Sequence, residues 1–248
     1  MARNKSLIKL EGSIGDLSFY DSVFGPIVRR KGGPDKKKIK TSPRMVRVRE
    51  QNREFGEAVK AAKLLRDCLK LGRLKEHSIT WRVNKLMNQV KDCDGTSTRG
   101  NRTVSKGLAT AAGKDLMKGF DIKEKSKLNK IILKSATINT GNQSISISQI
   151  VPSKDIKYPK GATHARLKGI CARIDFNKKK SEMQESTDVV LLLKSKVSSN
   201  VVLQMNPAAL NSGYDFYCIY VEFLQEINSV YYDLENKKHN CLNILRVI

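Results

Sequence analysis

The sequence predicts an α+β protein in which a basic N-terminal half precedes an antiparallel, immunoglobulin-like β-sandwich. Short β-favouring runs separated by glycines open the chain, and amphipathic helical patterns follow between residues 42 and 120. From about residue 128, β-branched or aromatic runs alternate with turn residues. We therefore expect two domains. Residues 1–125 would hold a β-hairpin or meander, a basic arm and a small helical cluster, and residues 126–248 would hold the sandwich.

Residues 6–30, SLIKLEGSIGDLSFYDSVFGPIVRR, are typical of short strands joined by tight turns. The β-favouring residues are Leu7, Ile8, Leu17, Phe19, Tyr20, Ile27 and Val28, and the glycines between them are Gly12, Gly15 and Gly25. This pattern predicts a small twisted hairpin or meander.

The next segment, KGGPDKKKIKTSP (residues 31–43), reads as a linker or an extended arm. It has two glycines and two prolines, and most of its other residues are lysine. Such a segment cannot bury enough apolar surface to order itself.

A helix is predicted next, with Ser42 as its N-cap and Pro43 at its first position. One apolar face is formed by Phe55, Val59, Ala62, Leu65 and Leu69, and we expect the helix to end near Leu71 and Gly72. A basic stripe beside that face comprises Arg53, Lys60, Lys63 and Lys70. This stripe fits anion binding and an ordinary solvated helix surface equally well.

Two further helices are expected within residues 80–92 and 104–120, joined by a loop over residues 93–102 that carries Arg99 and Arg102. Seven strands are then expected within residues 130–138, 144–151, 162–176, 188–195, 215–227, 229–235 and 241–248. The cysteine and tryptophan spacing of antibody domains is absent from this region.

The charge of the chain is large and uneven. Its 47 basic and 24 acidic residues give a net charge of +23. Residues 1–140 carry 33 basic and 14 acidic side chains, whereas residues 141–248 carry 14 and 10. Self-repulsion of this size is usually neutralised by a polyanion, most often nucleic acid, although it also serves solubility alone.

The expected polyanion site follows the basic run and the helix stripe. Its residues are Arg29, Arg30, Lys31, Lys36, Lys37, Lys38, Lys40, Arg44, Arg47, Arg49, Arg53, Lys60, Lys63 and Lys70. Lysine and arginine bind phosphates by releasing counterions, which requires charge density but no particular order. No aromatic residue lies between Phe24 and Phe55, so we expect contacts to the phosphate backbone and no stacking on bases.

The residues favour no catalytic, metal or cofactor chemistry. The stretch Gly107–Asp115 (GLATAAGKD) has one residue too many between its glycines for a phosphate loop, and Asp115 replaces the required hydroxyl. His77, His164 and His239 are far apart, and the five cysteines form no paired motif. No signal peptide or apolar run long enough to span a membrane is present, so we expect a cytoplasmic protein.

Several segments together resemble a family of uncharacterised proteins from Bacteroidota. These are IKLEGSIGDLSFY, RRKGG, VREQNREFGEAVKAAKLLR, GATHARLKGICARIDF and YVEFLQEINSVYYDLENKKHNCLNILRV. The family pattern is a KGxIGxxxFY start, a KGG segment, a REN-xEFG helix and a β-rich C-terminal half. This chain departs from it at Gln51 and Asn52. The resemblance implies the same division into a basic half and a β-rich half, and it implies no activity.

Two functions remain open from the sequence. The first is a non-enzymatic protein that binds nucleic acid or another polyanion through its N-terminal half. The second is a structural subunit of a filament, tube or phage-like particle, in which the arm and hairpin add strands to the sheet of a neighbouring copy.

Overall fold

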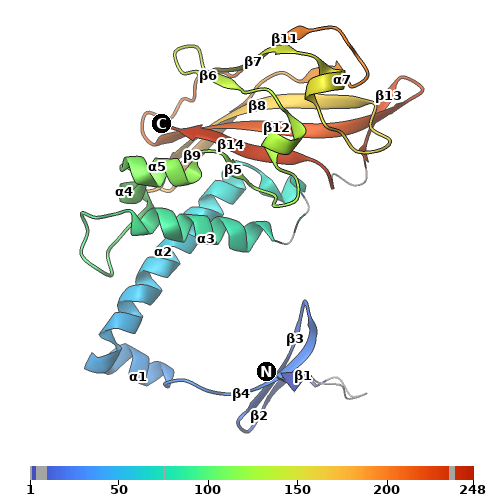
Figure 1. The fold of residues 1–248 in the computed structure, drawn as a ribbon. Coiled ribbons are helices and arrows are strands. Elements are labelled where there is room, and N and C mark those ends of the chain that lie inside the picture. The colour runs from blue at the N-terminus through green and yellow to red at the C-terminus, as the bar shows by residue number, and fades with distance from the viewer. Residues whose placement is uncertain (1, 4–9, 75, 77, 235–237) are drawn as a thin grey trace. The chain divides into compact units, whose positions relative to one another are not determined.

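The computed structural model describes residues 2–3, 10–74, 76, 78–234 and 238–248, and it has an α+β fold of helices and antiparallel sheets (Figure 1). The strand expected at Leu7 and Ile8 lies outside the described residues. The chain forms two compact units, residues 1–49 and residues 50–248, here called the N-terminal and C-terminal units. This division differs from the expected boundary at residue 125, because the helices after residue 50 share a hydrophobic core with the large sheet.

The N-terminal unit contains a four-stranded antiparallel sheet in the order β1-β4-β3-β2. Its strands are β1 (Ala2–Arg3), β2 (Gly12–Ile14), β3 (Leu17–Ser22) and β4 (Gly25–Arg30). The turn between β2 and β3 places Gly15 at a φ of +54°, and β4 starts with Gly25 at a φ of +97°. Glycine adopts these left-handed conformations without strain, so the expected meander forms where the glycines punctuate the sequence.

The lysine-rich segment after β4 is a helix, α1 (Lys36–Thr41), and the expected extended arm is wrong at these residues. The side chain of Asp35 accepts a hydrogen bond from the backbone N–H of Lys37 and caps the start of the helix. At its other end, the Arg49 guanidinium donates to the carbonyls of Ile39 and Ser42, at 2.8 Å each. These two interactions stabilise helix α1, whereas its lysines do not.

The helices of the C-terminal unit follow a short 3₁₀ turn, η1 (Pro43–Met45), in which Pro43 stands near the start as expected. They are α2 (Val46–Cys68), of which residues 50–68 belong to this unit, η2 (Leu71–Leu74), α3 (Ile79–Asp92), α4 (Val104–Leu108) and α5 (Ala111–Met117). The single helix expected over residues 104–120 is divided, because the Thr110 hydroxyl accepts from the Gly113 N–H and starts a new helix.

The buried face of α2 is rotated relative to the expected one. Glu54, Ala58, Ala61, Ala62, Leu65 and Cys68 are buried. Phe55, which was expected on the apolar face, is 51% exposed. Trp81, in the first turn of α3, is 54% exposed. Small alanines face the core in α2, so that the helix lies close to its neighbours.

The large sheet has seven strands, with the main order β10-β8-β12-β14-β5; β9 pairs with β8 and β13 pairs with β12. Its strands are β5 (Phe120–Asp121), β8 (His164–Asp175), β9 (Lys180–Glu185), β10 (Val189–Leu192), β12 (Tyr214–Ile227), β13 (Val230–Asp233) and β14 (Cys241–Val247). A smaller sheet, in the order β11-β7-β6, contains β6 (Thr137–Asn139), β7 (Ser144–Ile150) and β11 (Ser199–Gln204). Two single-turn helices, α6 (Leu128–Ile131) and α7 (Pro152–Asp155), precede β6 and follow β7 in sequence.

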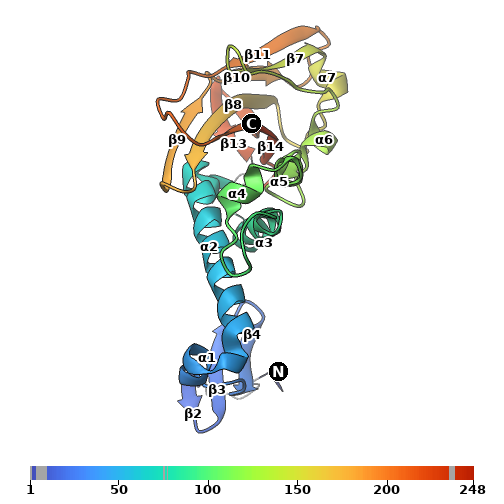
Figure 2. The ribbon, with the colours of Figure 1, turned by 90° about the vertical axis from the view of Figure 1, so that its left-hand side faces the viewer.

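Alternating residues of β12 join two separate cores. Phe216 and Cys218 pack with the buried residues of α2–α5, whereas Tyr217 and Ile219 pack with the small sheet. The C-terminal unit is therefore layered, with helices on one face of the large sheet and the small sheet on the other (Figures 1 and 2). The strand run expected over residues 130–138 begins as helix α6, and the sequence reading missed β9 and β11.

None of the described helices is long and apolar enough to cross a membrane.

Candidate polyanion interface

The lysines of α1 form the densest group of unneutralised charge in the expected site. Lys36, Lys37, Lys38 and Lys40 are all exposed. Among the residues that the structure describes, no carboxylate forms an ion pair with any of them. The Asp35 carboxylate is used for the backbone cap of the helix. Four ammonium groups are thus held on one helical turn and a half and remain available to an external anion.

The arginine that orders this segment has an internal role. Arg49 is half-buried, and its guanidinium holds the carbonyls at the end of α1. The contact of Arg49 with a polyanion stays a prediction, and the structure shows in addition that its side chain supports the helix that carries the lysines. Arg44 and Arg47, which flank it, are exposed.

The three cations at the end of β4 are exposed and have weak local partners. Arg29 lies over the ring of Tyr20, with 5.6 Å between the guanidinium carbon and the ring centroid. Arg30 forms an exposed ion pair of 3.5 Å with Asp16. The Nζ of Lys31 donates to the carbonyl of Gly15. Exposed pairs of this kind contribute little stability, so these side chains can exchange their local partners for a bound anion.

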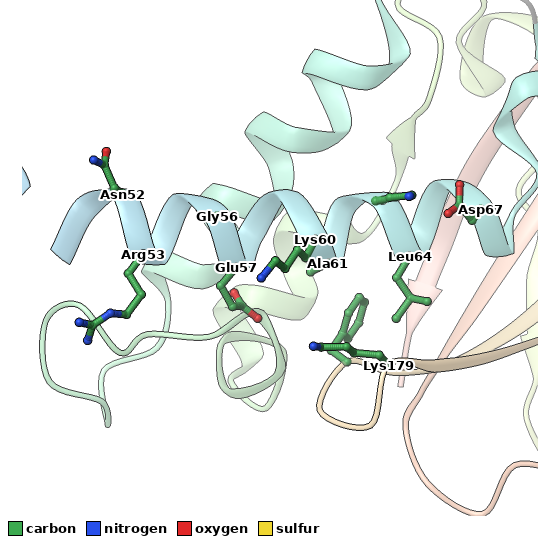
Figure 3. A pocket seen from close by; sticks show the side chains of 11 residues that line it. Asn52, Arg53, Gly56, Glu57, Lys60, Ala61, Leu64, Asp67 and Lys179 are labelled. Carbon is green, nitrogen blue, oxygen red and sulfur yellow. The ribbon is translucent and has the colours of Figure 1, made fainter. Parts of the chain in front are cut away.

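Three cations of the helix stripe line a groove of about 640 Å³ in the C-terminal unit. One wall is α2, and the other is the turn between β8 and β9 (Figure 3). The lining residues are Asn52, Arg53, Gly56, Glu57, Lys60, Ala61, Lys63, Leu64, Asp67, Phe176 and Lys179. Lys70 is not among them, since it lies beyond the end of α2 with a φ of +49°. The structure therefore brings together three of the four stripe residues.

Lys179 is the functional candidate that sequence reasoning missed. It lies more than 100 residues after α2 in the chain, and the β8–β9 hairpin carries it to the groove. Figure 3 shows Leu64 on α2 extending toward Lys179, and Lys60 extending toward Glu57. No local pattern around residue 179 distinguishes it from the lysines beside it, so only the strand pairing could have identified it.

The groove is apolar at its base and charged at its rim. Ala61 and Phe176 are buried, Leu64 is half-buried, and Lys60, Lys63 and Lys179 are exposed. Burial raises the pKa of Glu57, and a hydrogen bond from the N–H of Val104 partly offsets this effect. Four cations against two acids, Glu57 and Asp67, give the groove an excess of positive charge.

A buried ion pair fixes the helix wall of the groove to its neighbour α3. The Nζ of Lys91 donates to Glu54 Oε2 at 3.0 Å and to Asp92 Oδ1 at 2.8 Å, and Glu54 also accepts from the N–H of Gly100 at 2.6 Å. Burial alone would raise the pKa of Glu54, but the hydrogen bonds from Lys91 and Gly100 lower it overall. The pKa of Lys91 is raised by its two carboxylate partners against the opposing effect of burial.

Asp94 organises the loop that follows α3. Its carboxylate accepts from the N–H groups of Thr96, Ser97 and Thr103 and from the Thr96 hydroxyl. Burial opposes ionisation, yet these hydrogen bonds hold the pKa of Asp94 well below its usual value. Arg102 in the same loop lies 3.8 Å from Glu54 and 3.6 Å from Asp92, so this expected loop arginine is tied to the buried pair.

The glycines of the GLATAAGKD stretch are explained by packing. A Cβ built on Gly107 would lie 2.0 Å from the carbonyl oxygen of Val90 in α3. A Cβ on Gly113 would lie 2.1 Å from the carbonyl oxygen of Gly107. Both positions therefore need glycine so that α3, α4 and α5 can approach closely. Within the described residues, no group of three or more histidine, cysteine or acidic side chains is arranged to hold a metal ion, and His77 lies outside them.

Comparisons of the chain with protein-family models, with curated proteins and with solved structures found no match.

Proposed function

We propose that this is a non-enzymatic protein whose N-terminal unit binds nucleic acid through the phosphate backbone. The observation that carries the proposal is the set of four exposed α1 lysines without a carboxylate partner among the described residues. Residues 1–49 contain 13 basic and 4 acidic side chains, a net charge of +9. A phosphate backbone supplies closely spaced negative charge that matches this density.

The lysine helix is itself a physical argument for an anionic partner. A six-residue helix is too short to be stable alone, and like charges four residues apart, such as Lys36 and Lys40, destabilise it further. The cap from Asp35 and the hydrogen bonds from Arg49 offset part of that cost. Phosphates bound along α1 remove the repulsion, so nucleic acid stabilises the same helix that binds it.

The contacts are expected to be to phosphates and not to bases. No aromatic residue occurs between Phe24 and Phe55, and the ring of Tyr20 is already covered on one face by Arg29. Lysine ammonium groups act as point charges without the planar geometry that reads a base edge. Binding should therefore differ little between unrelated nucleic-acid sequences of equal length.

Replacing Lys36, Lys37, Lys38 and Lys40 by glutamine should weaken binding to a labelled duplex of about 20 base pairs by roughly a hundredfold or more at about 0.1 M salt. The reason is that each lysine releases counterions from the phosphates it contacts. Fluorescence anisotropy of the labelled duplex measures the change.

The matched control replaces Lys154, Lys157, Lys160 and Lys196 by glutamine. These lysines are also exposed, and they lie in the C-terminal unit, so the control removes the same net charge. Its affinity should stay within a few-fold of the wild type, because the proposed phosphate contacts are made by the α1 lysines, which this variant keeps. Equal weakening in the two variants would show that net charge, and not α1, governs binding.

Assembly into a larger particle is the second candidate, and the sheet of the N-terminal unit favours it. Among residues 10–49, whose burial the structure describes, none is buried. The register places Ile14 opposite Leu17 and Phe19 opposite Val28, which gathers these apolar residues on one sheet face. Ile14 is 61% and Leu17 41% exposed. A sheet of short strands without a buried core gains stability when another copy covers that face or extends its edge.

Deleting residues 1–40 tests this second candidate. The deletion should convert a large, nucleic-acid-free assembly into monomers, because it removes the sheet and most of α1 while leaving both cores of the C-terminal unit intact. Size-exclusion chromatography with light scattering gives the mass of each species. A deletion variant that still assembles, or a full chain that is already monomeric, contradicts the assembly model.

A further inference from the structure

We infer that the groove between α2 and the β8–β9 turn is a docking site for an acidic amphipathic helix of a partner protein. This inference is independent of the proposed nucleic-acid binding, which rests on the N-terminal unit. The base and the rim of the groove differ in polarity. Leu64, Ala61 and Phe176 form an apolar base, and four cations surround it. A ligand that fits must bury apolar groups and present negative charge on both sides of them.

A nucleic-acid strand does not meet this requirement. Each sugar of its backbone is flanked by phosphates, so the backbone offers no continuous apolar face to place against Leu64, and its bases need an exposed aromatic ring on which to stack. Phe176 is the aromatic residue of the lining, and it is 7% exposed. Its ring and that of Phe216 pack edge to face, with 6.2 Å between the ring centroids. A protein segment with aliphatic side chains and carboxylates fits both the base and the rim.

The partner segment is helical because the α2 wall cannot satisfy an extended backbone. The N–H and C=O groups in the interior of α2 are bonded within the helix, so they offer no hydrogen bonds to a strand lying along it. A strand in the groove would bury backbone N–H and C=O groups without hydrogen-bond partners, whereas a helix forms these hydrogen bonds within itself. The lining from Asn52 to Asp67 spans about 22 Å, enough for roughly four helical turns.

Gly56 is a second indication that another chain approaches this wall. It lies within the 23-residue helix α2, where glycine is about 1 kcal/mol less favourable than alanine. A Cβ built there would meet nothing within 4 Å, so no packing inside the chain requires glycine. The missing side chain leaves room for a partner helix to lie close to the α2 backbone beside Lys60.

A second copy of this chain does not suit the groove. The rim of Arg53, Lys60, Lys63 and Lys179 selects for an acidic segment, and a chain with a net charge of +23 is a poor source of one. The partner is therefore a different protein with an acidic helix whose leucine-like residues recur every three or four positions.

The probe for this site is a displayed library of peptides about 16 residues long. Leucine is fixed at helical spacing, and the remaining positions vary among glutamate, aspartate, alanine and glutamine. Selection on the full chain should yield acidic members whose binding falls at least tenfold in the Gly56→Leu variant, which fills the groove. A library with no member that binds the wild type better than Gly56→Leu overturns the inference.

Two further variants separate docking from changes in folding. Gly56→Ala should raise the melting temperature by about 2 °C, because alanine favours the helix, and yet weaken peptide binding. The triple variant Lys60→Glu, Lys63→Glu, Lys179→Glu should lose the acidic peptide and bind the same peptide with lysine in place of each acid. If it binds neither form, or if Gly56→Ala leaves affinity unchanged, the groove is not the docking site.

The lysine variants of α1 keep this result distinct from the proposed function. Replacing Lys36, Lys37, Lys38 and Lys40 by glutamine should abolish strong duplex binding and leave peptide binding intact, since these residues do not line the groove. The Gly56→Leu variant should weaken peptide binding and leave duplex binding intact. If selected peptides instead compete with the duplex for the wild type, the two sites are one, and the separate docking site is excluded.

Discussion

Replacement of Gly107 by alanine is expected to destabilise the C-terminal unit by at least about 4 kcal/mol, or to prevent its folding. The added Cβ would lie 2.0 Å from the carbonyl oxygen and 2.8 Å from the carbonyl carbon of Val90. Both atoms belong to the backbone of α3, so no side-chain rotation can relieve the clash. The two helices must move apart, which opens the core around the buried Leu108.

The matched control for this prediction is Gly56→Ala. Both glycines stand within helices, but only Gly107 faces another backbone, so the gain in helix propensity is similar and the clash differs. Urea unfolding should show Gly56→Ala slightly more stable than the wild type and Gly107→Ala far less stable. A Gly107→Ala variant of wild-type stability would mean that α3 and α4 are not packed as described.

Replacement of Lys91 by methionine is expected to destabilise the protein by about 3–5 kcal/mol at pH 7. Lys91 is 1% exposed, and its removal leaves the buried carboxylate of Glu54 without its ammonium partner. Methionine has a similar shape, so the loss comes from the missing ammonium group, which leaves the more distant Arg102 as the cation beside Glu54, and not from a cavity. The loop that contains Gly100 and Arg102 should also loosen, because both residues bind Glu54.

The dependence of this effect on pH has a definite sign. In the wild type, the pKa of Glu54 is lowered by folding, so its contribution to stability is present above the unfolded value of about 4.3 and is lost as the pH falls through the folded value. Without Lys91, its hydrogen bond and its charge no longer oppose the effect of burial, so the pKa of Glu54 rises relative to the wild type. The difference in unfolding free energy between wild type and Lys91→Met should therefore shrink as the pH falls from 7 to about 4.

A double variant provides the control. Glu54→Gln combined with Lys91→Met is neutral at both positions and keeps an acceptor for the Gly100 N–H, so it should recover most of the stability lost by Lys91→Met alone. Chemical unfolding of the four proteins in this cycle measures the coupling. Additive losses for the two substitutions would be incompatible with a stabilising buried pair.

Several of the longer strands could be predicted because their pattern is local. β8, β12 and β14 are long runs of β-favouring residues, and strict alternation in the Ser144–Ile150 run predicted β7. The layered arrangement with helices on one face could not be predicted. It depends on which residues of β12 face which core, and a strand that is buried on both faces carries no polar alternation to show this.

The misassigned elements each depend on a contact distant in sequence. Helix α1 is fixed in part by Arg49, ten residues after Ile39, and lysine composition alone argues for an arm. The exposure of Phe55 follows from the burial of Glu54, which turns the inner face of α2 toward Lys91, 37 residues away. A lone glutamate within an amphipathic pattern gives no sign that it is buried, so helical periodicity predicted the helix and not its orientation.

The charge of the candidate site could be predicted from the sequence, but the positions of its side chains could not. The basic composition located the lysines of α1 and the cations of the α2 stripe. It did not separate Arg49, which supports α1, from the lysines that remain exposed, nor did it place Lys179 in the same groove as Lys60. Those distinctions depend on hydrogen bonds and on strand pairing, which a charge count does not contain.

The salt dependence of duplex binding tests the central claim most directly. The logarithm of the association constant is measured against the logarithm of the salt concentration for the wild type and for the variant with Lys36, Lys37, Lys38 and Lys40 replaced by glutamine. If each lysine contacts one phosphate, the magnitude of the slope should fall by about 3 to 4 in the variant. A wild-type slope near zero, or a slope that the substitutions leave unchanged, would contradict backbone binding through α1.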